Sequence, residues 1–363
     1  MDGIIGFIGF GLIGGSIAKR IKKIYPHYTI MAYSNSVNEL IDASNDGIVN
    51  VILDSIDKHF STCDMIFLCA PVTYNIAYLP LLKSLIKPSC IITDVGSTKT
   101  GIHQSVSFLL LEHSFIGGHP MAGSEKSGYK HSSTHLIENV YYIITPTKQT
   151  PTSNLEFFTH FIASLGAIPL VLDYETHDFI VATISHLPHI VAAQLVQLVM
   201  EHDTQNETMK QIAAGGFKDI TRIASCSPIL WEQICMDNRH HLIPILETYI
   251  HGLKDTLSVL KKGESEKIYD LFHTSGTYRN SMTHSVSGPI PPKYSIYCNL
   301  IDKTGAIATV ATILSNSNIS IKNIGIVHNR EQFEGALNIQ FYDNTSYEQA
   351  KKTLQEHGYS IFF

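Results

Sequence analysis

The chain has 363 residues, of which 44% are hydrophobic, with a formal net charge of −6 at pH 7 and a mean hydropathy of +0.07. At about 150 residues a domain, this length predicts two or three domains, each with enough apolar side chains for a core. The acidic balance disfavours nucleic acid or an anionic membrane as a partner, so an anionic ligand would need a local cluster of basic groups.

Short apolar runs alternate with helical patterns through the first half of the chain. This alternation, with nearly continuous apolar strands, indicates a parallel sheet covered by helices on both faces. The predicted strands are residues 3–9, 28–33, 64–70, 90–95, 114–118, 140–145 and 167–172. The predicted helices between them include residues 12–24, 74–87 and 152–165.

The first strand leads directly into a glycine-rich turn, Gly9-Phe10-Gly11-Leu12-Ile13-Gly14, and then into a helix. In this spacing Gly9 forms the tight turn, Gly11 admits a pyrophosphate close to the backbone, and Gly14 packs the helix on the strand. The N-terminus of the helix adds free N–H groups and the positive end of its dipole. The pattern predicts a Rossmann-type NAD(P)-binding domain over residues 1–172; a glycine-rich turn without a ligand is the alternative.

The end of the second strand departs from the usual pattern of such domains. An acidic residue is expected there to bind the ribose of NAD, but the sequence has Ser34 followed by Asn35. No arginine stands there for the additional phosphate of NADP. Ser34 is expected to bind the ribose as a neutral group, so NAD is the predicted cofactor and NADP the alternative.

Two further segments follow strands at the edge where open parallel sheets bind ligands. The segment CAPVTY brings Ala70 and Pro71 alongside a cofactor. The segment DVGSTK puts Ser97 and Lys99 at the mouth of the site.

A third segment, GGHPMAGSEKSG at residues 117–128, is predicted to be a loop because glycine and proline disfavour helix and strand. It would bring His119 close to the nicotinamide ring. The chain has 19 histidines, so a surface or packing role is the alternative for this one.

Strand signals stop at about Tyr174, and a helical domain is predicted over residues 173–282. The apolar segment 179–200 is long enough to cross a bilayer, but it contains two histidines, two glutamines and a proline, which favours a helix buried in protein. The predicted helices are residues 175–202, 206–215, 229–236 and 238–262.

This helical domain carries two pairs of candidate ligand-binding residues. His186 and His189 share one helical face on either side of Pro188, as metal ligands or as core histidines. Lys218 and Arg222 are four residues apart, so both can project to one side and bind a carboxylate. A solvated charged face is the alternative for the second pair.

Residues 283–293 gather Ser, Gly and Pro and are predicted to be a linker. The order strand, helix, strand, strand, helix, strand then predicts a small α+β module over residues 294–363. Six cysteines without a CxxC pair indicate reduced thiols, and the N-terminus lacks a secretory signal, so a cytoplasmic protein is expected.

Together these motifs resemble the prephenate dehydrogenase family of tyrosine biosynthesis. The specific matches are GGHPMAGSEKSG and FKDITRIA, supported by GFGLIGGS, CAPV, DVGSTK and SHLPH. The tail resembles an ACT domain, a regulatory module that binds amino acids, with Asp302, Gly305 and Ala306 opening its first helix.

The resemblance implies oxidative decarboxylation of prephenate to 4-hydroxyphenylpyruvate, with hydride transfer to NAD(P). It implies that His119 is the catalytic base and that Ser97 binds the substrate hydroxyl and orients the histidine. The resemblance further implies that the substrate is bound by Arg222, His189, Lys218 and Glu125.

The resemblance also implies a homodimer formed by the helical domain and feedback by tyrosine at the ACT-like module. No metal is expected, because no HExxH pattern and no third ligand accompany His186 and His189. The alternatives are an arogenate or cyclohexadienyl dehydrogenase, a β-hydroxyacid dehydrogenase, and a non-catalytic nucleotide or amino-acid sensor.

Overall fold

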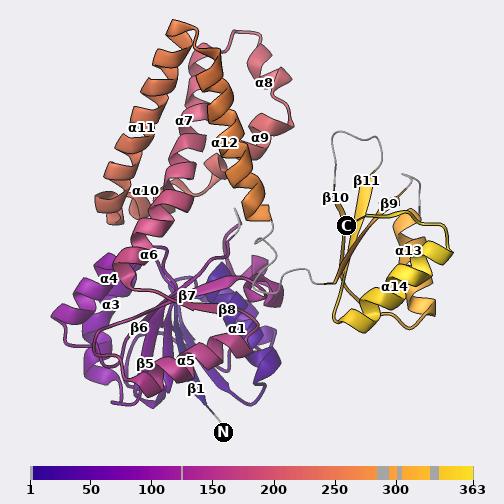
Figure 1. Cartoon of the computed structure of the whole chain (residues 1–363). Helices are drawn as coiled ribbons and strands as arrows, with labels where there is room; N and C mark the ends of the chain where they lie inside the picture. Colours follow the sequence, from indigo (N-terminus) through magenta and orange to yellow (C-terminus); the bar gives the residue numbers. More distant parts are fainter. Residues whose placement is uncertain (1–2, 124–125, 284–293, 301–304, 328–334, 363) are drawn as a thin grey trace. The chain divides into compact units, whose positions relative to one another are not determined.

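The computed structural model describes residues 3–123, 126–283, 294–300, 305–327 and 335–362. The chain divides into two compact units, residues 1–272 and 273–363, each of which is described by itself (Figure 1).

The first unit begins with a five-stranded parallel sheet in the order β3-β2-β1-β4-β5. This is the strand order of a dinucleotide-binding fold and confirms the predicted Rossmann-type domain. The short strand β3 was not predicted, because three residues are too few for an alternating pattern to be recognised. The strands are β1 (Ile4–Ile8), β2 (Thr29–Tyr33), β3 (Val51–Leu53), β4 (Met65–Leu68) and β5 (Ile91–Asp94).

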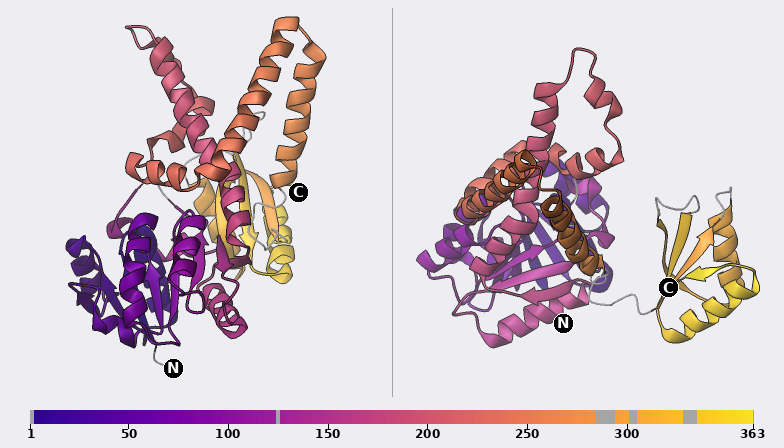
Figure 2. Two further views of the ribbon diagram at one scale, coloured as in Figure 1. Left: turned by 90° about the vertical axis from the view of Figure 1, so that its left-hand side faces the viewer. Right: turned by 45° about the horizontal axis from the view of Figure 1, so that its top comes forward.

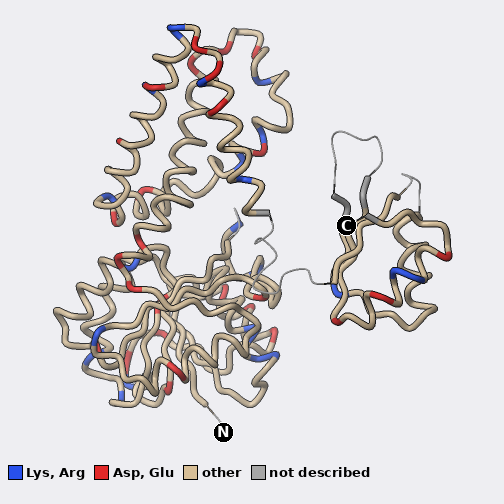
Figure 3. The backbone as a smooth tube through the Cα atoms, viewed as in Figure 1, with Lys and Arg blue, Asp and Glu red and all other residues tan. Residues whose placement is uncertain are grey.

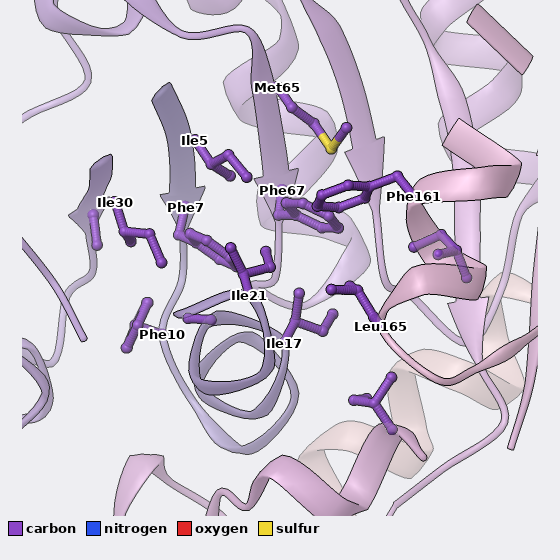
Figure 4. Close-up of a cluster of buried hydrophobic side chains, with 14 of the residues drawn as sticks. Ile5, Phe7, Phe10, Ile17, Ile21, Ile30, Met65, Phe67, Phe161 and Leu165 are labelled. Atoms are coloured by element: carbon purple, nitrogen blue, oxygen red, sulfur yellow. The ribbon is translucent and has the colours of Figure 1, made fainter. Parts of the chain in front are cut away.

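Alternate residues of the central strands supply two separate cores, one on each face of the sheet. Phe7 and Phe67 stack with ring centroids 5.2 Å apart on the face covered by α1, α2 and α5 (Figure 4). Ile8 and Leu68 face α3 and α4 on the other side (Figures 1 and 2). The helices are α1 (Leu12–Ile24), α2 (Val37–Asn45), α3 (Val72–Leu85), α4 (Thr100–Phe108) and α5 (Thr152–Ser164).

The three later strands form a second sheet instead of extending one parallel sheet, which corrects the prediction. β6 (Ile116–Pro120) pairs antiparallel with β7 (Tyr141–Pro146), and β7 pairs parallel with β8 (Ile168–Val171). The connection from β6 to β7 contains two short 3₁₀ helices, η2 (Tyr129–His131) and η3 (Thr134–Ile137), but no crossover helix. A parallel pairing needs such a crossover. β6 still lies beside β5, through a bridge between Ile92 and Phe115.

The prediction that His119 lies in a loop is wrong, since Gly117, Gly118 and His119 belong to β6. Glycine is required here by close packing. A Cβ on Gly117 would lie 2.2 Å from the hydroxyl oxygen of Thr145. A Cβ on Gly118 would lie 2.7 Å from both the backbone oxygen of Asp94 and the hydroxyl of Tyr142. The glycines therefore let this strand approach its neighbours.

A helical region follows, as predicted, but its first long helix contains a π-helical turn, η4 (Ala182–His186), just before Pro188. The predicted helix 206–215 is shorter, and a separate α9 ends before Arg222, so Lys218 and Arg222 do not share one α-helix. The elements are α6 (Tyr174–Val181), η4, α7 (Leu187–His202), α8 (Thr208–Ile212), α9 (Gly215–Thr221), the 3₁₀ helix η5 (Arg222–Ser225), α10 (Pro228–Asp237), α11 (Arg239–Lys262) and α12 (Ser265–Thr283).

The segment Tyr174–His202 is long and apolar enough to cross a membrane by length and composition, and 28% of its most apolar window is buried. Its first part packs on α4 and β7 and carries the fully buried polar residues His177 and Asp178. Ala192 is the one buried residue of α7, so the predicted burial of residues 179–200 is confirmed for the first part of the segment and not for α7.

The second unit contains a four-stranded antiparallel sheet in the order β10-β11-β9-β12, with two helices on one face (Figures 1 and 2). The predicted order of strands and helices is confirmed. Of the predicted linker 283–293, Thr283 ends α12 and the rest lies outside the described residues. The elements are β9 (Ser295–Leu300), α13 (Ala306–Asn316), β10 (Ile321–Val327), β11 (Gly335–Phe341), α14 (Asn344–Glu356) and β12 (Ile361–Phe362).

We expect Gly118→Ala to lower the melting temperature, because the added methyl would collide with backbone and with a buried tyrosine. Overpacking of this kind costs about 1–3 kcal/mol. Gly123→Ala is the matched control, since a Cβ there meets no atom within 4 Å. Equal melting temperatures for the two variants in thermal unfolding would contradict the packing explanation.

Candidate active site

The glycine-rich turn after β1 has the geometry that dinucleotide binding needs. Gly9 has φ +85°, and a Cβ on it would lie 2.6 Å from the backbone nitrogen of Ala70. A Cβ on Gly14 would lie 3.0 Å from the oxygen of Gly9, so the helix packs closely on the turn. Gly11 has no atom within 4 Å of its Cβ position, which leaves open space at the start of α1. Leu12 and Ile13 form the first turn of that helix.

The predicted cofactor residues after β2 and β4 lie at the ends of these strands. Ser34 is half-buried and accepts a hydrogen bond from the backbone of Ser36 at 3.3 Å. Ala70 and Pro71 form the turn between β4 and α3. The buried Asn75 accepts from the nitrogen of Ala70 at 3.2 Å and donates to its oxygen at 2.8 Å. Asn75 was missed by the sequence analysis, and it holds this turn in place.

Asp94 is the only Lys, Arg, Asp or Glu in strands β1–β8. The other charged residues that the structure describes in the first unit lie on helices and loops (Figure 3). Asp94 forms a fully buried ion pair with Lys99. This corrects the prediction that Lys99 lies at the mouth of the site. Asp94 also accepts from the backbone nitrogen of Gly118 at 3.3 Å, which ties β5 to β6 next to His119.

The loop that carries Ser97 is held at both ends. At its start, Gly96 donates its N–H to Asp94 at 2.9 Å. At its end, Lys99 and Thr100 both donate their backbone N–H to the carboxylate of Asp178, each at 2.8 Å. Ser97 lies between these anchors and is half-buried. Asp178 thus joins α6 to the start of α4.

His119 is hydrogen-bonded to a second histidine that the sequence analysis did not single out. Its Nδ1 lies 2.8 Å from Nε2 of His177, and Nδ1 of His177 lies 2.8 Å from the carboxylate of Asp178. His177 and Asp178 are fully buried, while His119 is half-buried. No clear signal for them is present in the sequence, because His177 and Asp178 end a polar run, residues 173–178, at the start of α6 and look like solvent-exposed residues of a first helical turn.

Burial shifts the pKa values of this chain of residues. The pKa of His119 is well below its ordinary value chiefly because protein surrounds the ring; the positive charge of Lys99, and of His177 or His186 when either is protonated, lowers it further. Burial also lowers the pKa of His177. Burial alone would raise the pKa of Asp178, but hydrogen bonds from His177 and Thr100 outweigh it and hold the pKa low. The favoured charges are a neutral His119, a neutral His177 and an ionised Asp178.

His189 lies in α7 and is not part of this chain of hydrogen bonds. Its ring stacks on Trp231 with centroids 3.6 Å apart, and its Nε2 lies 4.0 Å from the sulfur of Cys226. The residue at the end of the π-helical turn, His186, contacts the amide of the buried Asn238 at 3.1 Å. That amide also donates to the backbone oxygen of Asp178 at 2.7 Å.

Arg222 and Lys218 are exposed on a segment that packs against α7. Arg222 opens η5, which leads to Cys226 beside His189, so the structure brings it near His189 and not into the hydrogen-bonded group of His119. Glu125 lies outside the described residues. Within the described ranges, no group of three or more His, Cys, Asp or Glu side chains is arranged to hold a metal ion, and all six cysteines are free.

Two family profiles match the chain, one after the other. Residues 17–170 match the profile described as the nucleotide-binding domain of prephenate dehydrogenase. Residues 173–274 match the profile described as its dimerization domain.

Individual proteins agree with these matches. The prephenate dehydrogenase of Bacillus subtilis (strain 168) is 33% identical over 98% of this chain and 96% of its own length. A crystal structure of prephenate dehydrogenase from Aquifex aeolicus, in complex with hydroxyphenyl propionate and NAD+, is 28% identical, with a TM-score of 0.73 over 78% of this chain and 98% of that one. A structure of arogenate dehydrogenase from Synechocystis is 27% identical, with a TM-score of 0.68 over 77% of this chain and 99% of that one. The glycine-rich turn, the buried histidines and these similarities together place the chain in the prephenate dehydrogenase family.

Proposed function

We propose that this chain oxidises prephenate to 4-hydroxyphenylpyruvate, with loss of the ring carboxylate as carbon dioxide and transfer of a hydride to NAD. The observation that carries the proposal is an uncharged histidine, His119, held beside the end of β5 in a chain of this family. The same chemistry needs a proton acceptor for the substrate hydroxyl, and a neutral imidazole suits that role.

The residues around the glycine-rich turn fit a dinucleotide. Gly11 leaves space where a pyrophosphate would approach the start of α1, and Ser34 is a neutral group placed for a ribose hydroxyl. NAD, when bound, supplies the hydride acceptor. We propose that the cofactor is held by Gly9, Gly11, Leu12, Ile13, Gly14, Ser34, Ala70 and Pro71.

His119 and Ser97 would act on the hydroxyl-bearing carbon of the substrate. His119 accepts the hydroxyl proton while the hydride leaves that carbon, and Ser97 hydrogen-bonds the hydroxyl oxygen. The developing ring carbonyl draws electrons from the departing carboxylate, and aromatisation drives the step forward. The hydrogen bonds at both ends of the Ser97 loop support this arrangement. Gly96 donates to Asp94, which also binds the backbone of Gly118, and Lys99 donates to Asp178, which also binds His177.

Prephenate carries two carboxylates, so an acidic protein has to provide local cations. We assign this role to Arg222, with Lys218 and His189 beside the substrate and Glu125 controlling access. The packing of η5 on α7 supports a shared site for Arg222 and His189. The similarity to an arogenate dehydrogenase makes arogenate the second candidate substrate.

We also propose that the chain is a cytoplasmic homodimer formed by its helical region. The match to a dimerization-domain profile supports this. A stripe of exposed apolar side chains at helical spacing on α11 supports it as well, because such a stripe on a soluble protein needs a cover. The stripe consists of Ile243, Ile250, Leu253, Leu257 and Leu260.

The small C-terminal module would be an ACT-like regulatory domain that binds tyrosine. The domain division proposed is then residues 1–172, 173–282 and 294–363, with a linker at 283–293. Gly305, with φ +85°, precedes α13, and the buried Ala306 begins that helix. Asp302, the third proposed contact, lies outside the described residues.

A four-way assay tests the reaction: prephenate or arogenate, each with NAD or NADP, followed by the absorbance of the reduced nicotinamide. We expect the highest kcat/KM with prephenate and NAD. His119→Asn should reduce kcat by about 10²- to 10⁴-fold, the usual contribution of a general base, with little change in melting temperature. Full activity in a folded His119→Asn protein would exclude His119 as the base.

The pH dependence of kcat/KM provides a separate check. A base must be uncharged, and the lowered pKa keeps His119 uncharged to lower pH than an ordinary histidine. Activity should persist below pH of about 6.5, the ordinary histidine value, and be lost as the pH falls through the lowered pKa. An acidic limb at or above the ordinary value would contradict this assignment.

Tyrosine should reduce prephenate turnover and raise the melting temperature of the wild-type chain. Gly305→Val should weaken both responses, because valine is strained at φ +85° and distorts the start of α13. Gly358→Val is the matched control, since Gly358 has φ +83° at a different turn of the same module. If tyrosine, phenylalanine and tryptophan all leave activity and melting temperature unchanged, the regulatory proposal is wrong.

A further inference from the structure

With both histidines neutral, as their lowered pKa values favour, the chain of hydrogen bonds that joins Asp178, His177 and His119 has only one arrangement of protons that satisfies it. A carboxylate accepts hydrogen bonds and cannot donate them. Asp178 already accepts the N–H groups of Lys99 and Thr100, and the hydroxyl of Thr100 at 2.6 Å. His177 must therefore carry its proton on Nδ1, the atom that faces Asp178 at 2.8 Å.

The same reasoning then applies to the contact between the two histidines. A neutral His177 with its proton on Nδ1 has a lone pair on Nε2. Nδ1 of His119 lies 2.8 Å from that lone pair and must donate to it. The proton of His119 is thus on Nδ1, and its Nε2 keeps the lone pair.

We infer that His177, held by Asp178, is a positioning residue that keeps the proton of His119 on Nδ1 and leaves Nε2 as the atom that takes the substrate proton. The inference rests on the proposed role of His119 as the base. His177 touches neither substrate nor cofactor in this scheme and acts only through His119.

The arrangement also favours the charged state that forms during the reaction. When Nε2 of His119 takes the hydroxyl proton, the ring becomes an imidazolium, and its Nδ1–H makes a charge-assisted hydrogen bond to His177. The carboxylate of Asp178 lies on the far side of His177 and disperses the positive charge. His119 returns the proton to solvent after the product leaves, so the group ends each cycle in its starting state.

Other charged or titratable groups surround the two rings. Lys99 and Asp94 form the buried ion pair beneath β6, and their opposite charges largely cancel. His186 faces the rings from the π-helical turn, and burial lowers its pKa to about 4, which keeps it neutral near pH 7.

His103 of α4 is also buried, and its pKa, lowered to about 3, keeps it neutral. Asp237 of α10 interacts electrostatically with Asp178, and burial raises the pKa of its carboxyl group. Asp178 is the carboxylate in direct contact with the ring of His177.

Two substitutions of His177 separate positioning from packing. His177→Gln keeps an amide oxygen near the place of Nε2, able to accept from His119. His177→Leu fills similar space without an acceptor. We expect His177→Leu to lower kcat by about 10- to 100-fold with little change in KM, in line with the loss of one hydrogen bond to a charged group. His177→Gln should restore most of this loss. His177→Leu should melt at a lower temperature than His177→Gln, because it leaves the buried carboxylate of Asp178 one donor short, so the kinetics are compared at a temperature at which both proteins are folded.

The pH profile and the tautomer provide readouts that a packing role would not move. Loss of the acceptor destabilises the imidazolium, so the acidic limb of kcat/KM should move to lower pH in His177→Leu but not in His177→Gln. In ¹⁵N-histidine NMR, His119, assigned by its absence in His119→Asn, should carry its proton on Nδ1 in the wild type. It should populate both tautomers in His177→Leu.

Equal losses in both variants, with an unmoved acidic limb and an unchanged His119 tautomer, would overturn the inference. A shift of the limb to higher pH in His177→Leu would overturn it too, since His177 would then act as a repelling cation. The NMR measurement needs no turnover. Failure of the wild type to oxidise prephenate would therefore remove the proposed function while leaving the proton arrangement separately tested.

Discussion

The buried carboxylate of Asp178 is the constraint on which the site depends. An ionised carboxylate away from water is costly unless every hydrogen-bonding position is used. Asp178 meets that requirement with donors from the start of α4 and from the ring of His177. In doing so it fixes α6 against the nucleotide-binding domain. These bonds fix the first helix of the helical region, α6, next to the carboxyl end of β5, where a cofactor would bind.

Close packing constrains strand β6. This strand passes so close to β5 and β7 that Gly117 and Gly118 have no room for a Cβ. Asp94 then reaches the backbone of Gly118, and its charge is met by Lys99 within the core. His119 pairs with Ile143 of β7 and follows Gly118, which the carboxylate of Asp94 holds from the other side. His119 therefore has little freedom to move away from His177. Rigid strands position reacting groups better than loops do.

Several parts of the fold could be predicted from local patterns. The alternation of apolar runs and helices predicted the parallel sheet, and the βαββαβ order of the tail was confirmed. The spacing of Gly9, Gly11 and Gly14 predicted the turn, because each glycine is required by the backbone conformation or close packing of the turn itself. The break after β5 could not be predicted, since the pairing direction of β6 and β7 depends on how the intervening chain returns and not on the composition of either strand.

The sequence by itself determined the order of helices and strands in most of the chain and the nucleotide fingerprint, because short-range spacing and residue type carry that information. His119 became the candidate base through the resemblance of its segment to a known family. Only the tertiary structure decided the surroundings of His119. The contact between His119 and His177 joins residues 58 positions apart, and the bonds from Asp178 to Thr100 span 78. Lys99 looked like a site residue by its place in the loop, yet packing buried it with Asp94. The packing of α6 on the sheet brings these distant residues together, and no local sequence pattern predicts such contacts.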